Sequence, residues 1–285
     1  MKAALDCLPC AINQGRNAVT HSTDDTALQE RILRLVAETY AAKHLTGTPA
    51  AFSQEAYDLV ARETGRRDPF AAEKKRCNDM ALAMLLECCT ALEHSGDPLA
   101  TGAQLAVAGN IIDLGIAQQL DIHGTLRRAL HTPFAVNDLE RLRADLARAA
   151  TVLYIGDNAS EIVIDRVFIE TMQKLYPALR VTFSVKSGPI INDATIDDAR
   201  AVGMDKVCAL IETGNALIGA PLAHVSAAFR HMFDAADVII SKGQGNFETL
   251  NTETQRPLYF MLKAKCNLVA EELGVQFGDS VLKHV

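Results

Sequence analysis

The spacing of hydrophobic residues changes along the chain, and the change predicts two kinds of structure. Between residues 12 and 94 the apolar positions recur every three or four residues, which is typical of helices with one buried face. One helix is expected over 26–45 and a long apolar one over 71–93, and Ser53 is expected to cap the helix between them. Beyond residue 150 the apolar residues instead form short runs of strand length.

Helical patterns separate most of these short runs, so strands and helices are expected to alternate. The predicted strands are 151–155, 181–185, 206–211, 236–241 and 257–264, and they follow a charged helix predicted over 135–149. Alternation of this kind is typical of a mainly parallel sheet with helices on both faces. We therefore predict an all-helical domain over residues 1–98 and a Rossmann-like, three-layer α/β/α domain over residues 99–285.

Oxygen-bearing side chains follow two of the predicted strands. Asp157 and Asn158 come directly after the strand 151–155, and Asp193 follows the strand 181–185. The carboxyl ends of parallel strands meet at one edge of a sheet, where open α/β folds bind ligands. Carboxylate and amide oxygens suit magnesium or manganese better than zinc. These three residues are therefore candidate metal ligands, the alternative being that Asp157 or Asn158 only caps the following helix.

A lysine and two glycines follow a third predicted strand. Lys242 is a candidate phosphate ligand, and Gly243 and Gly245 would let backbone N–H groups approach an anion. Metal ligands and a phosphate-binding loop on neighbouring strand ends are what metal-assisted phosphoryl transfer requires.

At these residues the sequence resembles the metal-dependent damage-control phosphatases, formerly a domain of unknown function. The resemblance spans nearly the whole chain, in order, and Ser160 departs from it where a glycine is more usual. The matching segments are Gly156-Asp-Asn-Ala-Ser-Glu161, Ile191-Asn-Asp193-Ala-Thr195-x-x-Asp198-Ala, Lys242-Gly-x-Gly-Asn-x-Glu248, Asp68-Pro-Phe-x-x-x-Lys74-x-x-x-Asn78, Gly109-Asn110-x-x-Asp113 and Lys263-x-Lys265-Cys266. An early Cys7-Leu-Pro-Cys10 matches the stand-alone prokaryotic-type subgroup.

The resemblance implies an enzyme that hydrolyses small phosphorylated metabolites, such as sugar phosphates or damaged and side-product phosphometabolites. Asp157, Asn158 and Asp193 would hold one divalent ion, which could be manganese, magnesium, cobalt or nickel. Asp157, Glu161 and Lys242 are the expected catalytic residues, with Glu161 orienting the attacking water or acting as a base. Direct attack by water and a phospho-enzyme on Asp157 both remain open. The expected substrate-binding residues are Asn78, Asn110, Asp113, Lys242, Gly243, Gly245 and Asn246.

Composition and charge narrow the alternatives. A net charge of −7 argues against a general nucleic-acid binder. No apolar run approaches the roughly 20 residues of a membrane span, and the start of the chain has no signal-peptide pattern, so a cytoplasmic location is expected. Seven cysteines, an odd number, argue against a disulfide framework. Cys7 and Cys10 have metal-ligand or redox spacing, although a structural role is favoured for them.

Two other functions are considered. A nucleotide- or sugar-phosphate-binding protein without catalysis would explain the glycines and Lys242, but not three metal ligands at successive strand ends. A dinucleotide oxidoreductase is disfavoured, because a lone Gly-x-Gly at 243–245 follows a late strand.

The helical domain carries polar residues that its own packing does not explain. We expect it to pack across the carboxyl ends of the strands, so that the site lies in the cleft between the two domains. Asn78, Asn110 and Asp113 should then lie within about 10 Å of Asp157, about one Debye length.

Overall fold

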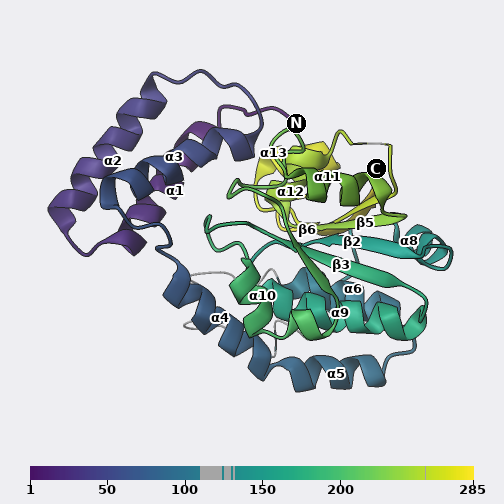
Figure 1. Cartoon of the computed structure of the whole chain (residues 1–285). Helices are drawn as coiled ribbons and strands as arrows, with labels where there is room; N and C mark the ends of the chain where they lie inside the picture. Colours follow the sequence, from purple (N-terminus) through teal and green to yellow (C-terminus); the bar gives the residue numbers. More distant parts are fainter. Residues whose placement is uncertain (110–123, 125–129, 131, 254) are drawn as a thin grey trace.

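The computed structural model describes residues 1–109, 124, 130, 132–253 and 255–285 (Figure 1). Three helices form the N-terminal part: α1 (Cys7–Ser22), α2 (Thr26–Ala41) and α3 (Pro49–Thr64). Asp25 caps α2 by accepting two backbone N–H groups, and Thr48 caps α3, with Pro49 in its first turn. Ser53 therefore lies inside α3, and the prediction that it starts the helix is wrong.

The predicted helix 71–93 is two helices, because the chain turns at Met84. They are α4 (Ala71–Ala83) and α5 (Leu85–Glu93), and α6 (Pro98–Ala108) follows. Most of their buried apolar residues belong to the hydrophobic cluster on one face of the sheet. A separate cluster is formed by residues 7–70 together with Ile190. The clusters thus divide the chain near residue 70, and the boundary between residues 98 and 99 stays a prediction.

The sheet has seven strands in the order β1-β7-β6-β5-β2-β3-β4, all parallel except for the antiparallel pair β6–β7. The strands are β1 (Val136–Asn137), β2 (Thr151–Ile155), β3 (Arg180–Val185), β4 (Ala209–Glu212), β5 (Val238–Lys242), β6 (Leu258–Lys263) and β7 (Ser280–His284). The sequence predicts β2 to β6 but not β1 and β7. It also starts β4 too early, because the short 3-10 helix η2 (Met204–Lys206) precedes that strand.

Helices cover both faces of the sheet (Figure 1). On one face lie α6, α9 (Glu161–Leu175) and α10 (Ile196–Ala201), and on the other lie α11 (Ala227–Ala235), α12 (Gln244–Leu250) and α13 (Asn267–Leu273). The short helix α8 (Leu139–Leu146) packs beside β7. The predicted fold class, a helical part followed by a three-layer α/β/α unit with a mainly parallel sheet, is confirmed.

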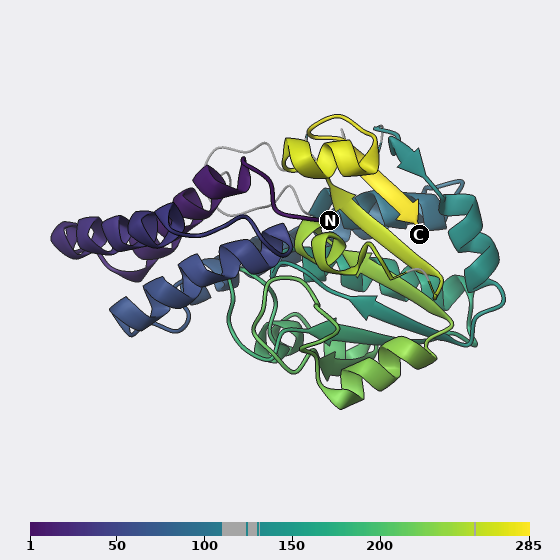
Figure 2. The same cartoon turned by 90° about the horizontal axis from the view of Figure 1, so that it is seen from above.

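The strand order reverses at β2. Its neighbours are β3 on one side and β5 on the other, both parallel to it. The helix after β2 lies on one face and the helix after β5 lies on the other, so a crevice opens between them at the carboxyl ends of these strands. Figure 2 shows the N-terminal helices, in purple, beside one end of the sheet. No helix among the described residues is both long and apolar enough to cross a membrane.

Candidate active site

Backbone hydrogen bonds join the two loops that carry the predicted metal ligands. The N–H of Ala194 donates to the carbonyl of Asp157 at 2.8 Å. Asn158 and Asp193 pair across the two loops as an antiparallel bridge. The side chains of Asp157, Asn158 and Asp193 thus start from adjacent stretches of backbone, although 35 residues separate Asn158 from Asp193 in the sequence.

The two carboxyl groups of this site oppose each other's ionisation. Burial raises the pKa of Asp157 well above its ordinary value, and the charges of Asp193 and Glu161 raise it further. Burial also raises the pKa of Asp193, although Lys186 opposes this with its Nζ 3.5 Å from Asp193 Oδ2. A divalent cation would relieve the repulsion. Two carboxylates and the amide of Asn158 are a hard oxygen donor set, so these residues fit magnesium or manganese.

Gly243 lies directly under the carboxylate of Asp157. Its φ of +78° is one that side-chain-bearing residues rarely adopt, and a Cβ built there would lie 1.8 Å from Asp157 Oδ2. The glycine-rich loop therefore makes room for the acidic ligand. We predicted from the sequence that Gly243 would approach a substrate anion, but in the structure it is the carboxylate of Asp157 that it approaches.

A cavity of about 330 Å³ opens above Asp157. It lies between the N-terminal helices and the carboxyl edge of the sheet, where the cleft is predicted, while the predicted closeness of Asn78, Asn110 and Asp113 to Asp157 stays a prediction. Its lining includes Asp6, Cys7, Cys10, Gln14, Ser53 and Tyr57 from the N-terminal part and Asp157, Asn158, Asn192, Asp193, Gln244, Gly245, Glu248, Lys265 and Cys266 from the α/β part.

Lys242 does not reach this cavity. Its side chain is fully buried, and its Nζ donates to the Ala106 carbonyl at 2.8 Å, to Asp165 Oδ1 at 2.7 Å and to Glu161 Oε2 at 3.1 Å. Three acceptors match the three protons of an ammonium group. Burial alone would lower the pKa of Lys242, but the charges of Asp165 and Glu161 outweigh burial and raise it. The position of Lys242 does not support its predicted role as a phosphate ligand.

Glu161 and Asn246 also lie beneath the cavity rather than in its wall. Glu161 is fully buried, and its Oε1 accepts a hydrogen bond from Asn158 Nδ2 at 2.9 Å. Asn246, also fully buried, donates from Nδ2 to the carbonyls of Lys242 and Gly156 at 2.7 and 3.1 Å. Neither placement matches the predicted direct contact with water or substrate.

The motif residues of α4 have a structural explanation. Lys74 is buried, and its Nζ lies 2.9 Å from Asp68 Oδ2 and 3.2 Å from Asp198 Oδ2. Asp198 in turn forms the capping box of α10 with Thr195. These residues link α4 to the helix that follows the Asp193 loop. Asn78 is buried on α4, does not line the cavity, and its Oδ1 has no hydrogen-bond partner in the described part of the chain.

The predicted substrate residues Asn110 and Asp113 lie outside the described residues. The cavity wall instead includes groups that the sequence did not single out for contact with a substrate. Lys265 is one of them, and its positive charge lowers the pKa of Asp157. Glu248 is another, and burial raises its pKa to about 7 while Gln244 Nε2 donates to it at 2.9 Å. In the sequence, Lys265 and Glu248 are distinguished only by lying in segments that resemble the family.

Three thiols also line the cavity. Cys7 and Cys10 come from α1 and Cys266 from the residue before α13, and burial raises the pKa of each. All three are free thiols. Across the described ranges, no three Cys, His, Asp or Glu side chains are arranged to hold a metal ion.

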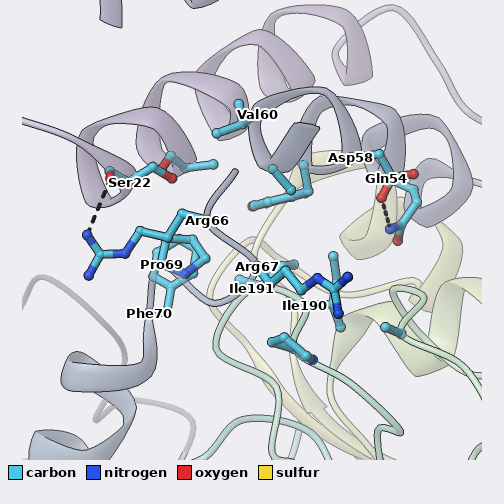
Figure 3. A pocket seen from close by; sticks show the side chains of 15 residues that line it. Ser22, Gln54, Asp58, Val60, Arg66, Arg67, Pro69, Phe70, Ile190 and Ile191 are labelled. Carbon is cyan, nitrogen blue, oxygen red and sulfur yellow. Dashed lines mark hydrogen bonds between the residues drawn. The ribbon is translucent and has the colours of Figure 1, made fainter. Parts of the chain in front are cut away.

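A second, smaller cavity of about 100 Å³ shares the lining residues Tyr57 and Ile191 with the first, and Figure 3 shows it with Ile190 and Ile191 labelled. It marks where the helical part meets the loop before Asp193. Ile191 has a φ of +48°, which a β-branched residue rarely adopts and which stores strain. Ile190 is buried in the hydrophobic cluster of α1–α3, three residues before Asp193. Packing against the helical part therefore holds the loop in this conformation.

Comparisons with known proteins identify the family of the chain. Residues 3–281 match the family model described as the damage-control phosphatase ARMT1-like domain. The chain is 34% identical over 285 residues to damage-control phosphatase PH1575 of Pyrococcus horikoshii, covering 99% of this chain and 97% of that protein. It is 30% identical to a damage-control phosphatase of Archaeoglobus fulgidus, covering 100% of both chains.

A solved structure has the same fold. It is the crystal structure of a DUF89 family protein from Pyrococcus horikoshii, with a TM-score of 0.90, 33% identity and coverage of 100% of this chain and 99% of that one. The relatives support a phosphatase role for this chain. The chain belongs to the ARMT1-like damage-control phosphatase family.

Proposed function

We propose that the protein is a metal-dependent phosphatase that hydrolyses phosphate monoesters of small metabolites in the 330 Å³ cavity above Asp157. The observation that carries the proposal is the meeting of two carboxyl groups, a partly exposed one and a buried one, with an amide at the β2 switch point, in the lining of that cavity. Asp157, Asn158 and Asp193 would hold one divalent ion. Bound there, manganese, magnesium, cobalt or nickel would polarise a phosphoryl oxygen and offset developing negative charge.

Lys265 is the residue that we assign to the phosphoryl group in place of Lys242. It lines the cavity, and its charge acts on Asp157. A lysine ammonium is a compact point charge suited to phosphate. The helical part covers the site, which limits water around the reacting group.

The size and lining of the cavity favour a small polar substrate. Its volume lies at the lower end of the range usual for ligand pockets. Gln14, Ser53, Gln244 and Glu248 offer donors and acceptors that suit the hydroxyl groups of a sugar phosphate. A binding protein without catalysis is the alternative, and it predicts affinity for phosphate esters without turnover.

The test is release of inorganic phosphate from p-nitrophenyl phosphate and a panel of sugar phosphates, with EDTA and then with each metal restored. We expect turnover that EDTA abolishes and manganese or magnesium restores. Binding without phosphate release would favour the non-catalytic alternative, and turnover unaffected by EDTA would contradict metal dependence.

Lys265→Met tests the phosphate ligand. Its matched control is Lys263→Met, two residues earlier in the chain, at a position that does not line the cavity. We expect Lys265→Met to lower turnover at least about tenfold, about 1.4 kcal/mol, with manganese affinity unchanged. Equal rates in both variants would remove Lys265 from the site.

A further inference from the structure

A continuous set of buried polar contacts runs from Lys242 to the amide of Asn158. Lys242 Nζ donates to Glu161 Oε2 at 3.1 Å, and Glu161 Oε1 accepts from Asn158 Nδ2 at 2.9 Å. Lys242 and Glu161 are fully buried, and Asn158 is 7% exposed. Lys242 and Glu161 therefore have no bulk water as an alternative partner, whereas Asn158 also lines the cavity.

The donor and the acceptor in each of these hydrogen bonds can be assigned in only one way. A lysine ammonium can only donate, so the atom that faces it must accept. A carboxylate has two acceptor oxygens, so the oxygen of Glu161 that faces Asn158 also accepts. Asn158 must therefore turn its NH₂ group toward Glu161, which leaves Oδ1 as the amide atom that Glu161 does not engage.

Further contacts hold Lys242 in this role. The Ala106 carbonyl and Asp165 Oδ1 accept its other two protons, and Tyr154 OH donates to Asp165 Oδ1 at 2.7 Å. Asp165 lies one helical turn beyond Glu161 on α9, and its Oδ1 accepts from Tyr154 and Lys242 rather than from Asn158. The lysine is thus fixed from the side away from the cavity.

We propose that Lys242 and Glu161 are positioning residues that fix the amide of Asn158 with its oxygen toward the cavity. The proposal rests on the proposed function in one respect, namely that a divalent cation is what the oxygen meets. In this role Lys242 and Glu161 act by orienting Asn158 and do not need to contact the substrate. Without them the NH₂ group and the oxygen of Asn158 could exchange places, and a cation would meet an N–H donor.

Glu161→Gln is the informative substitution, because it changes donors and acceptors at nearly constant volume. Lys242 would still demand an acceptor, so the oxygen of the new glutamine would face Lys242 and its NH₂ group would face Asn158. Asn158 would then have to turn its own oxygen toward residue 161 and its NH₂ group toward the cavity. We expect manganese affinity, measured by calorimetry, to fall about 10- to 100-fold.

The matched control is Asp165→Asn. It makes the same acid-to-amide change on the same helix and touches Lys242, but not Asn158. We expect its manganese affinity to stay within about threefold of the wild type. An affinity of Glu161→Gln equal to that of the wild type, or an equal loss in both variants, would overturn the inference.

A second readout needs no metal. In the metal-free wild type, the side-chain NH₂ protons of Asn158 should exchange slowly with solvent, as measured by NMR and assigned by their absence in Asn158→Asp. The NH₂ group of Asn13, an exposed residue of α1, serves as the fast-exchanging reference. Exchange at Asn158 as fast as at Asn13 would overturn the inference. If the wild type binds no manganese, the proposed function fails, and the exchange rate still decides the direction of the amide.

Discussion

The residues of the site show which positions near a strand end can be placed from the sequence and which cannot. Asp157, Asn158 and Asp193 could be predicted to meet, because parallel strands bring their carboxyl ends to one edge. Lys242 could not be placed by that rule, since it is the last residue of β5 rather than the first of the loop. Side chains alternate along a strand, so Lys242 lies on the same face as Val238 and Ile240, toward α9. The alternation of side chains along β5 is therefore the feature of the sequence that predicts which face Lys242 lies on.

Gly243→Ala tests whether the glycine loop serves Asp157. The methyl group would displace the Asp157 carboxylate. Manganese affinity should therefore fall at least about tenfold, as it does when a group that holds a metal ligand in place is removed. Both the substitution and its control place alanine at positive φ and should cost about 1 kcal/mol of unfolding free energy.

The control is Gly65→Ala, where φ is +67° and no atom lies within 4 Å of the added methyl group. It should lose stability but keep manganese affinity. Calorimetry and denaturant unfolding of both variants measure the two effects. If both variants keep the manganese affinity of the wild type, Asp157 is not a metal ligand.

Glu248→Gln should change how stability depends on pH. The pKa of Glu248 is raised by burial from 4.5 to about 7. Below pH 4.5 both folded and unfolded states carry the proton. Between pH 4.5 and 7 only the unfolded state loses it, so the wild type loses stability as pH rises through this window. The variant lacks this loss and should exceed the wild type by up to about 3 kcal/mol above pH 7. A difference that does not vary from pH 4 to 8 would contradict the burial of an ionisable Glu248.

At the scale of elements, helix ends were harder to predict than helices. The sequence shows that 49–64 is helical, but Thr48-Pro49 begins the helix and Ser53 does not, since a threonine cap followed by proline outweighs a serine within the apolar pattern. The edge strand β1 has only two residues, too few to signal a strand, and β7, which lies between β1 and β6, shows too little alternation to do so. They form because the rest of the sheet offers them a partner.

Lys74→Met tests the link between α4 and α10. Lys74 is 3% exposed and lies between Asp68 and Asp198, so its removal leaves two carboxylates without their cation. We expect a loss of about 1–3 kcal/mol of unfolding free energy. The neighbouring Lys75→Met is the control, because Lys75 forms an exposed pair with Asp79 that should contribute less than about 0.5 kcal/mol. Equal losses in the two denaturant curves would rule out a bridging role for Lys74.

At the scale of the whole molecule, the cleft could be predicted and its lining could not. A sheet edge with charged residues needs cover, and the N-terminal helices were available to supply it. The predicted contact, Asn78, came from α4, but α1 and α3 supply the wall, with Gln14, Ser53 and Tyr57. Which helix faces the sheet depends on how α4 and α5 pack against α9, and that is a matter of shape rather than of sequence pattern.

Ile190→Ala tests whether the helical part holds the Asp193 loop. Ile190 is 6% exposed and packs in the cluster of α1–α3. Its truncation should cost about 2–4 kcal/mol of unfolding free energy and, by loosening the loop, also weaken manganese binding. Ile32→Ala, in the same cluster but on α2, should lose comparable stability with normal manganese affinity. Manganese affinity that is normal in both variants would mean that the loop holds its conformation without the helical part.

The central claim is that Asp157, Asn158 and Asp193 together hold one divalent ion. Anomalous diffraction from crystals soaked in manganese tests it most directly. We expect one strong peak on the cavity floor, bonded to an oxygen of each of the three side chains, with the NH₂ group of Asn158 turned toward Glu161. No peak at that position, or a peak held instead by the thiols of Cys7, Cys10 and Cys266, would contradict it.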